Sequence, residues 1–201
     1  MIKITNECNM ELMARYEDNY FDLAIVDPPY RDSNQPTKDM RANGSMKSLE
    51  GRPTKEYWAE LKRVSKEQII WGANNFELPQ WKGFVAWKKK TIGISFTMSM
   101  LEIASLSENL GTTSKWIEIQ PQNPNRIHPT EKPIKLYEWL LMNYAKEGNK
   151  ILDTHLGSGS IALACHNLKY NLTACELDTE YFNAAMKRLK QHQQQLTIFD
   201  I

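Results

Sequence analysis

The feature that most restricts how this chain folds is a strand, glycine turn, helix and strand in direct succession near its C-terminal end. Residues 150–153 form a short apolar run that ends at Asp153, and the glycine-bearing turn 154–160 follows it. Residues 161–168 are rich in Ala and Leu, which favours a helix, and residues 171–176 form a second apolar run. A helix between two short buried strands predicts a parallel βαβ unit.

The rest of the chain predicts a doubly wound, mostly parallel α/β sheet around this unit. Apolar runs predict strands at 21–26, 68–71, 84–87 and 101–106, and helices at 133–146 and 178–193. A length of 201 residues suits a single domain, which we expect to span 1–193, with 194–201 as a C-terminal tail. The polar segment 31–55 is expected to be a long loop that is either functional or partly disordered.

Charge and cysteine usage narrow the functional classes. Lys and Arg number 25 and Asp and Glu number 24, so any nucleic-acid surface must be local. No signal peptide is evident, and no apolar run approaches the roughly 20 residues that span a bilayer. Three cysteines without metal-ligand spacing indicate reduced thiols and no metal site. We therefore expect a cytoplasmic protein that does not enter membranes.

The segment Asp27-Pro28-Pro29-Tyr30 ends the strand at 21–26, where open α/β sheets bind their ligands. A base amine is a poor nucleophile because its lone pair is delocalised into the ring. Two acceptors, the Asp27 carboxylate and the Pro28 carbonyl, would hold its hydrogens and favour a more tetrahedral nitrogen that attacks a sulfonium methyl. Tyr30 offers a face on which a base can stack. The structural alternative is a strand-ending turn with a solvated Asp and a packed Tyr.

The turn after Asp153 has the features of a nucleoside site. Gly157 and Gly159 permit close backbone approach by a cofactor, and Glu176, about 20 residues later, is placed to bind ribose hydroxyls. The complete three-glycine dinucleotide fingerprint is missing, which weighs against NAD. Glycine turns also occur simply to pack a helix on a strand, and this turn by itself does not identify the cofactor.

Taken together, four blocks in this chain resemble the amino-directed DNA methyltransferases, in particular small phage-type members. The blocks are 27–30, 69–76, 128–133 and 153–160. The catalytic block precedes the cofactor block, which is the motif order of the β class, and the resemblance spans about residues 2–188. The chain departs from the family at Thr154 and His155, where the usual residues are Pro and Phe, and we expect the His155 ring to fill the Phe space.

This resemblance implies a Rossmann-like methyltransferase fold, S-adenosylmethionine as cofactor, and methyl transfer to the exocyclic amine of a flipped adenine in DNA without a metal. The catalytic residues that it implies are Asp27, Pro28, Pro29 and Tyr30. The cofactor-binding residues that it implies are Asp27, Thr130, Lys132, Asp153, Leu156, Gly157, Ser158, Gly159, Glu176 and Leu177, of which Glu176 would bind the ribose and Thr130 and Lys132 would lie near the methionine carboxylate.

Three alternatives remain open at this point. The same chemistry on the cytosine exocyclic amine is the nearest, and Asp rather than Ser before Pro-Pro-Tyr favours adenine. Methylation of RNA is the second. A catalytically inactive DNA-binding module is the third, and the intact Asp27 and Tyr30 argue against it. The sequence fits an enzyme of a restriction–modification pair and an orphan phage methylase equally well.

Partners follow from local charge and from the end of the chain. Basic candidates for DNA phosphates are Lys88, Lys89 and Lys90, and Arg31, Lys38, Arg41, Lys47 and Arg52 in the long loop. Residues 93–126 are short for a separate target-recognition domain, so specificity is either loose or shared across a homodimer. The tail segment Gln195–Phe199 resembles the pentapeptide that docks bacterial proteins on the replication sliding clamp; packing on the enzyme's own domain is the alternative.

Overall fold

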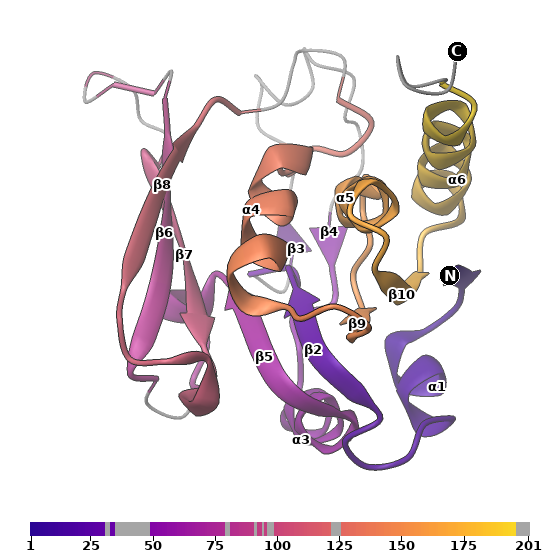
Figure 1. Ribbon diagram of the computed structural model, residues 1–201, viewed down its shortest axis with the longest axis horizontal. Helices are drawn as coiled ribbons and strands as arrows, with labels where there is room; N and C mark the ends of the chain where they lie inside the picture. Colours follow the sequence, from indigo (N-terminus) through magenta and orange to yellow (C-terminus); the bar gives the residue numbers. More distant parts are fainter. Residues whose placement is uncertain are drawn as a thin grey trace.

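The computed structural model describes residues 1–30, 33–34, 49–78, 81–90, 92–93, 95, 99–121 and 126–195. An eight-stranded sheet forms its centre (Figure 1). In spatial order the strands are β1 (Ile2–Asn6), β10 (Asn171–Glu176), β9 (Lys150–Asp153), β2 (Phe21–Val26), β5 (Ser65–Trp71), β7 (Leu101–Leu106), β6 (Gly83–Lys89) and β8 (Lys115–Ile119). A small antiparallel pair, β3 (Ser33–Asn34) and β4 (Leu49–Glu50), lies apart from this sheet.

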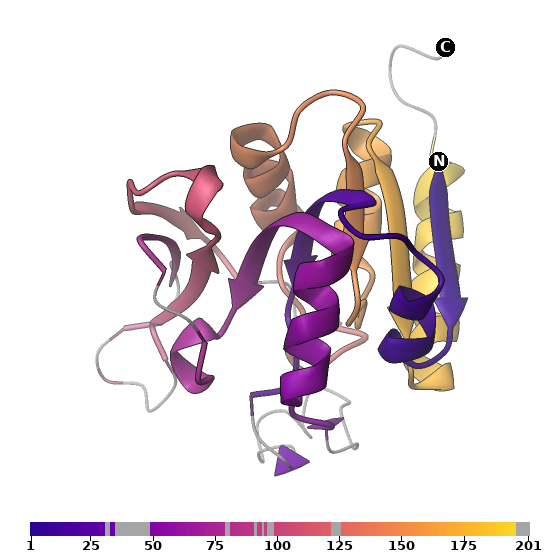
Figure 2. The same cartoon turned by 90° about the horizontal axis from the view of Figure 1, so that it is seen from below.

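Helices cover both faces of the large sheet, as Figures 1 and 2 show. One face carries α4 (Ile134–Tyr144), α5 (Ser160–Asn167) and α6 (Thr179–Gln193), and the other carries α1 (Asn9–Ala14) and α3 (Lys55–Val64). Two short 3-10 helices, η1 (Ala73–Asn75) and η2 (Glu108–Leu110), follow β5 and β7. Two buried apolar clusters match the two helical layers, one built on α4, α5 and α6 and one on α1 and α3. The fold is therefore a three-layer α/β/α domain.

The order of the strands fixes where a ligand site forms. From β2 the chain passes through α3 to β5 on one side, whereas from β9 it passes through α5 to β10 on the other. β2 and β9 pair in parallel, and the two crossovers lead away from them toward opposite edges of the sheet. The strand order therefore reverses between β2 and β9, which is the topological switch point of the sheet. Ligands in open α/β sheets bind beyond the carboxyl ends of the strands at such a point. Asp27 and Asp153 stand at those two ends.

The structure confirms the mostly parallel α/β fold and several strands predicted from the apolar runs. The strands at 21–26, 101–106, 150–153 and 171–176 have the expected bounds, whereas β5 and β6 are longer than expected. β7 runs antiparallel to β5 and β6, an arrangement that the sequence pattern does not distinguish from parallel pairing. Pro133 is the N-cap residue of α4 rather than a residue of its first turn.

Several elements were not predicted: β1, α1, α3, β8, the two 3-10 helices, and the short strands β3 and β4 within the expected loop 31–55. The strand β8 lies in the segment 93–126 and pairs with β6, so this part of the chain completes the main sheet. All three cysteines are free, as expected, and Cys165 and Cys175 are buried.

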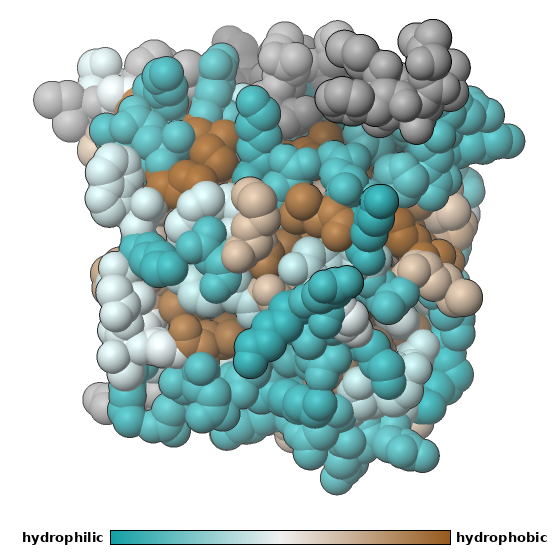
Figure 3. Space-filling view, in the orientation of Figure 1, coloured by the Kyte–Doolittle hydropathy of each residue, from teal (hydrophilic) through white to brown (hydrophobic). Residues whose placement is uncertain are grey.

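The outer surface over α4, α5 and α6 is mostly hydrophilic, with apolar residues in small separate patches (Figure 3). Among the residues that the structure describes, no helix has the length and apolar character needed to span a bilayer.

Candidate active site

The catalytic and cofactor motifs line one pocket of about 870 Å³. Its wall includes the turn after β2 (Asp27, Pro28, Pro29 and Tyr30), the turn after β9 (Thr154, His155, Leu156, Gly157 and Ser158), Glu176 at the end of β10 with Leu177 after it, and His128, Thr130 and Lys132 before α4. These segments meet because β2, β9 and β10 are parallel, so their carboxyl ends reach the same edge of the sheet. The segments that carry the sequence motifs therefore line the same pocket.

Asp27 is held on both of its carboxylate oxygens. The Tyr30 hydroxyl donates a hydrogen bond of 2.8 Å to Oδ1, and the Lys132 ammonium donates to Oδ2. Burial raises the pKa of Asp27 above its ordinary value, while the adjacent Lys132 charge acts in the opposite direction. Because each carboxylate oxygen has two lone pairs, both oxygens keep the capacity to accept one more hydrogen bond.

Lys132 lies in the interior, with 2% of its side chain exposed. Its ammonium is paired with Asp27 and lies 3.1 Å from Glu102 Oε2. The same nitrogen lies 5.2 Å from the centre of the Trp71 ring and 5.9 Å from that of Tyr30, within the range of cation–π attraction. Burial alone would lower the pKa of Lys132, but the two carboxylates raise it above its ordinary value, so the side chain is a cation.

Glu102, on β7, is shared between two cations. Its Oε1 lies 2.6 Å from Lys89 Nζ, on the neighbouring strand β6, while Oε2 faces Lys132. Burial opposes the ionisation of Glu102, yet the two lysines overcome this effect and lower its pKa to about 2. Glu102 is therefore a carboxylate in the same charge cluster as Asp27.

The Tyr30 ring packs against the segment that follows β5. A Cβ atom at Gly72 would lie 2.2 Å from Tyr30 Cε1, so only glycine leaves room for the ring. Gly72 has a φ of +67°, which also favours glycine. Phe76 packs edge-on against Tyr30, with 6.0 Å between ring centres. The block 69–76 therefore positions Tyr30.

The glycine turn and Glu176 are tied to each other directly. The Gly157 N–H donates a hydrogen bond of 2.8 Å to Glu176 Oε2, and the Asp178 N–H donates one of 3.0 Å to Oε1. Burial raises the pKa of Glu176, against the effect of these backbone donors. The next residue, Leu177, is 72% exposed at the pocket wall. A carboxylate beside an exposed apolar side chain suits a nucleoside, whose ribose is polar and whose base is flat and apolar.

Ser158 and Leu156 line the pocket, and residues of α6 and β10 hold their turn in place. Arg188 on α6 donates to the Ser158 carbonyl at 3.0 Å and pairs with Glu131 at 3.1 Å. The Leu156 N–H donates to the carbonyl of Cys175 at 3.0 Å. These contacts fix the turn against α6 and β10.

Two of the cofactor-binding residues implied by the resemblance, Asp153 and Gly159, are not among the residues that line the pocket, although the structure describes both. A Cβ at Gly159 would meet the Ala185 Cβ at 3.1 Å, so this glycine lets α5 and α6 approach each other. Asp153 is 2% exposed and accepts a hydrogen bond of 2.9 Å from the His155 N–H. Burial raises the pKa of Asp153 to about 8. Both residues support the turn from outside the cavity.

Thr154 and His155, the two residues that depart from the family motif, take part in a chain of polar contacts. The Thr154 hydroxyl shares a hydrogen bond of 2.7 Å with the Tyr57 hydroxyl and one of 2.9 Å with His155 Nδ1. His155 Nε2 lies 3.2 Å from Asn9 Nδ2, and its ring packs edge-on against Tyr57. Burial lowers the pKa of His155 to about 3, so the ring is neutral. His155 is thus a packed ring with two polar contacts that a Phe would lack.

His128 and Thr130 orient their own turn. The Thr130 N–H donates to His128 Nδ1 at 3.4 Å, and the Thr130 hydroxyl lies 3.2 Å from the same atom. The His128 ring packs edge-on against Tyr181. Burial, with a contribution from Lys132, lowers the pKa of His128 to about 4.

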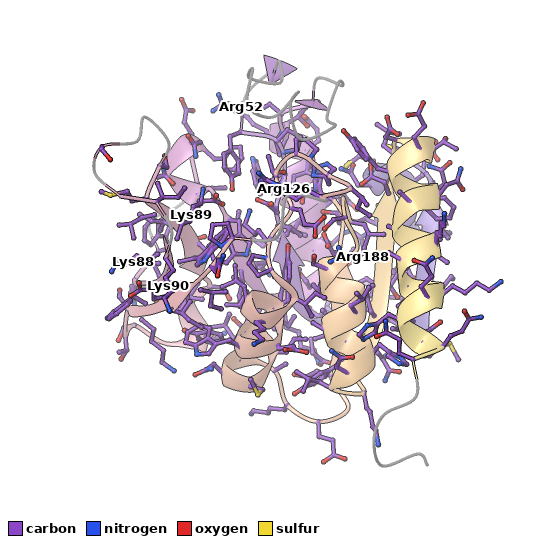
Figure 4. The ribbon with its side chains drawn as sticks, turned by 90° about the horizontal axis from the view of Figure 1, so that it is seen from above. Arg52, Lys88, Lys89, Lys90, Arg126 and Arg188 are labelled. Carbon is purple, nitrogen blue, oxygen red and sulfur yellow. The ribbon has the colours of Figure 1, made fainter. Side chains whose placement is uncertain are left out.

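The lysine run does not lie where the sequence places it, because Lys88 and Lys89 belong to β6 rather than following it. Lys88 pairs with Glu118 at 3.2 Å, and Lys89 pairs with Glu102 inside the site. Figure 4 shows Arg126 near the centre of the face that carries the site, and Arg52 at one side of it. Arg52 lines the pocket and donates to the Asn75 carbonyl at 2.8 Å. The other loop candidates, Arg31, Lys38, Arg41 and Lys47, lie outside the described residues.

Sequence reasoning missed the roles of Glu102, Lys89 and Gly72. Glu102 interrupts an apolar strand, which is a signal of a partnered or functional acid, but its partners come from β6 and from the segment before α4. Gly72 follows a strand and resembles any turn glycine until the Tyr30 ring is placed above it.

Comparison with known proteins identifies the family. Residues 17–187 match the N6_N4_Mtase family, described as DNA methylase. The chain is 24% identical over 202 aligned positions to the putative methylase YubD of Escherichia coli K12, covering 92% of this chain and 88% of YubD. It is 37% identical over 68 residues to the type II methyltransferase M.HpaI of Haemophilus parainfluenzae, covering 33% of this chain but only 22% of that enzyme.

Solved structures agree on the fold. The M1.HpyAVI–SAM complex has a TM-score of 0.64 at 20% identity, covering 94% of this chain and 99% of that one. PvuII DNA methyltransferase, which is cytosine-N4-specific, has a TM-score of 0.64 at 10% identity, covering 95% and 90% of the two chains. These likenesses confirm the Rossmann-like methyltransferase fold. With a family match that covers most of its length, the chain belongs to the S-adenosylmethionine-dependent, amino-directed DNA methylases.

Proposed function

We propose that this protein transfers a methyl group from S-adenosylmethionine to the exocyclic amine of an adenine flipped out of DNA. The observation that carries the proposal is that one pocket holds both the Asp27–Tyr30 turn and the Gly157–Glu176 pair. A base and a nucleoside cofactor that enter this pocket meet at the switch point between β2 and β9.

The residues of the pocket fit the cofactor. Gly157, with a φ of +53°, lies at the pocket wall, and Glu176 presents a carboxylate held by two N–H groups. Glu176 would bind the ribose hydroxyls, and the exposed Leu177 would contact the adenine ring. S-adenosylmethionine supplies an electrophilic methyl group on a sulfonium.

The Asp27 turn would prepare the amine for attack. The Asp27 carboxylate and the Pro28 carbonyl accept the two amine hydrogens, while the Tyr30 ring stacks on the base. The amine nitrogen forms the new N–C bond as the methyl–sulfur bond breaks, and the nitrogen then gives up one proton to Asp27 or to water. Since the amine itself attacks, the chain needs no covalent enzyme intermediate.

The choice of adenine rests on Asp27. The base amine of cytosine would meet the same two acceptors, so the pocket admits both chemistries in principle. An aspartate in place of serine before Pro-Pro-Tyr favours adenine by resemblance to the family.

DNA would approach over the face shown in Figure 4. Arg52 lies at the pocket wall, over the Phe76 ring at 5.7 Å. From there its guanidinium would contact the phosphates beside a flipped nucleotide. Lys88 and Lys89 are engaged with carboxylates, which makes Arg52 a better candidate for this contact than these two lysines.

The test is to incubate the protein with S-adenosylmethionine and DNA, and to identify the methylated nucleosides by mass spectrometry. We expect N6-methyladenine. N4-methylcytosine would move the target to cytosine, and methylation of RNA but not DNA would overturn the substrate. Asp27→Ala should still bind S-adenosylhomocysteine, because the Gly157–Glu176 pair is intact, but it should transfer no methyl group. Near-normal turnover by this variant would contradict the mechanism.

A further inference from the structure

A row of alternating charges runs from β6 into the pocket. Lys89 lies 2.6 Å from Glu102, Glu102 lies 3.1 Å from Lys132, and Lys132 contacts Asp27, which accepts from Tyr30. The four charged side chains are 15%, 21%, 2% and 14% exposed in that order. The cluster has two cations and two anions, so its net charge is zero, and this pairing offsets part of the cost of burying the charges.

Lys132, in the middle of this row, directs its ammonium toward two carboxylates and one hydroxyl. An ammonium has three N–H donors, and those of Lys132 face Asp27, Glu102 and, at 3.4 Å, the Tyr30 hydroxyl. All three partners belong to the base-binding side of the pocket. A lysine that is enclosed in this way has no donor left to reach a cofactor carboxylate.

We infer that Lys132, held in place by Glu102 and Lys89, is a positioning residue that keeps Asp27 ionised and oriented as the acceptor of the target amine. The inference rests on the proposed function, because it assigns a role toward the same acceptor. An ionised Asp27 accepts hydrogen bonds on both oxygens, whereas a protonated one would turn a donor toward the amine. Without a cation beside it, a buried carboxyl favours the protonated form.

Asp27 and its neighbours in this row are surrounded by titratable groups from several elements. The groups in and around the row are Tyr30 on the same turn as Asp27, Glu102 on β7, Lys89 on β6, Lys132 and His128 before α4, Tyr137 on α4 and Asp153 on β9. Among them, Lys132 and Glu102 act on Asp27 with opposite signs: Lys132 lowers its pKa and Glu102 raises it. Removing the charge of Lys132 and removing that of Glu102 should therefore shift the pKa of Asp27 in opposite directions.

The experiment is to measure kcat against pH with saturating DNA and S-adenosylmethionine. Lys132→Met should lower kcat and move the acidic limb of the profile upward by about 1 to 3 pH units, the scale of losing an adjacent opposite charge. Glu102→Gln should move the same limb downward, because a negative charge next to Asp27 is removed. A role in packing alone would not produce shifts of opposite direction.

Neighbouring residues supply the controls. Lys89→Met removes the cation that supports Glu102, and Lys88→Met removes the adjacent lysine, which pairs with Glu118 instead. The Lys88 variant should keep the wild-type acidic limb. S-adenosylhomocysteine affinity should be unchanged in the Lys132 and Glu102 variants. If Lys132→Met weakens that affinity and leaves the acidic limb in place, Lys132 serves the cofactor and the inference is wrong.

A readout without turnover separates this inference from the proposed function. The Asp27 carboxyl carbon, ¹³C-labelled and assigned by its loss in Asp27→Asn, should titrate at higher pH in Lys132→Met and at lower pH in Glu102→Gln. Glu102→Gln keeps the Lys132–Asp27 pair, so it tests the idea even if Lys132→Met does not fold. Identical titrations in wild type and Glu102→Gln would overturn the inference whatever base the enzyme methylates.

Discussion

Gly72 and Tyr30 are in contact in a way that admits no side chain at position 72: a Cβ atom there would lie 2.2 Å from Tyr30 Cε1. The two residues come from different strand ends, yet the position of the ring that would stack on the target base depends on a glycine 42 residues later in the chain.

Gly72→Ala should therefore displace Tyr30 and lower kcat/KM on DNA by about tenfold or more, since base–aromatic stacking is worth about 1–3 kcal/mol. S-adenosylhomocysteine affinity should be retained. Gly148→Ala is the matched control, because Gly148 also has a positive φ of +82°, but a Cβ atom there would meet no other atom within 4 Å. Equal losses in the two variants would assign the effect to backbone strain.

Glu176→Gln should weaken S-adenosylhomocysteine binding by about 1–3 kcal/mol, the scale of a charge-assisted hydrogen bond. An amide keeps one of the two oxygens that hold Gly157 and Asp178, so the turn keeps part of its support. Calorimetric titration measures the change, with Glu138→Gln on α4 as a control. Unchanged affinity would place the ribose contact elsewhere.

Stability should fall in acid partly because of His155. Its pKa is lowered from 6.5 to about 3 in the folded protein, so between these values the unfolded chain binds a proton that the folded chain does not. The free energy of unfolding therefore falls as the pH drops below about 6.5. His155→Phe should remove up to about 3 kcal/mol of this loss at pH 4. Denaturant melts at pH 7 and pH 4 measure it; parallel losses in the two proteins would show that another group dominates.

DNA affinity should decrease with salt, and Arg52→Ala should reduce the slope of log K against log salt concentration by about one phosphate contact. Lys88→Ala should leave the slope unchanged, because that ammonium is paired with Glu118. Fluorescence anisotropy over a salt series measures both. An unchanged slope in Arg52→Ala together with a smaller slope in Lys88→Ala would show that Lys88, and not Arg52, contacts the phosphate.

Deletion of residues 195–201 should abolish binding to a bacterial sliding clamp without lowering the melting temperature. The helix α6 ends at Gln193, as the sequence predicts, and Leu196, Ile198 and Phe199 lie outside the described residues. These apolar side chains would be costly to expose without a partner. Binding that survives the deletion, or a melting temperature lowered by several degrees, would favour packing on the enzyme's own domain.

The sequence by itself determined the class of fold and the two segments that make up the candidate site, which are the Asp27–Tyr30 turn and the glycine turn with Glu176. Apolar runs ending in Asp27 and in the glycine turn specify parallel strands, since burial on both faces needs continuous hydrophobic residues and turns need Gly and Pro. Parallel strands bring their carboxyl ends to one edge, so the meeting of the Asp27–Tyr30 turn with Glu176 followed from local patterns.

The tertiary structure alone decided which charges meet. Lys132 resembles a cofactor contact in the sequence, but the antiparallel insertion of β7 between β5 and β6 brings Glu102 and Lys89 to it. Gly159 has the pattern of a cofactor glycine, yet it faces Ala185 of α6. Pairings of this kind depend on strand order and helix packing, which join residues distant in the chain, and periodicity along the sequence carries no information about them.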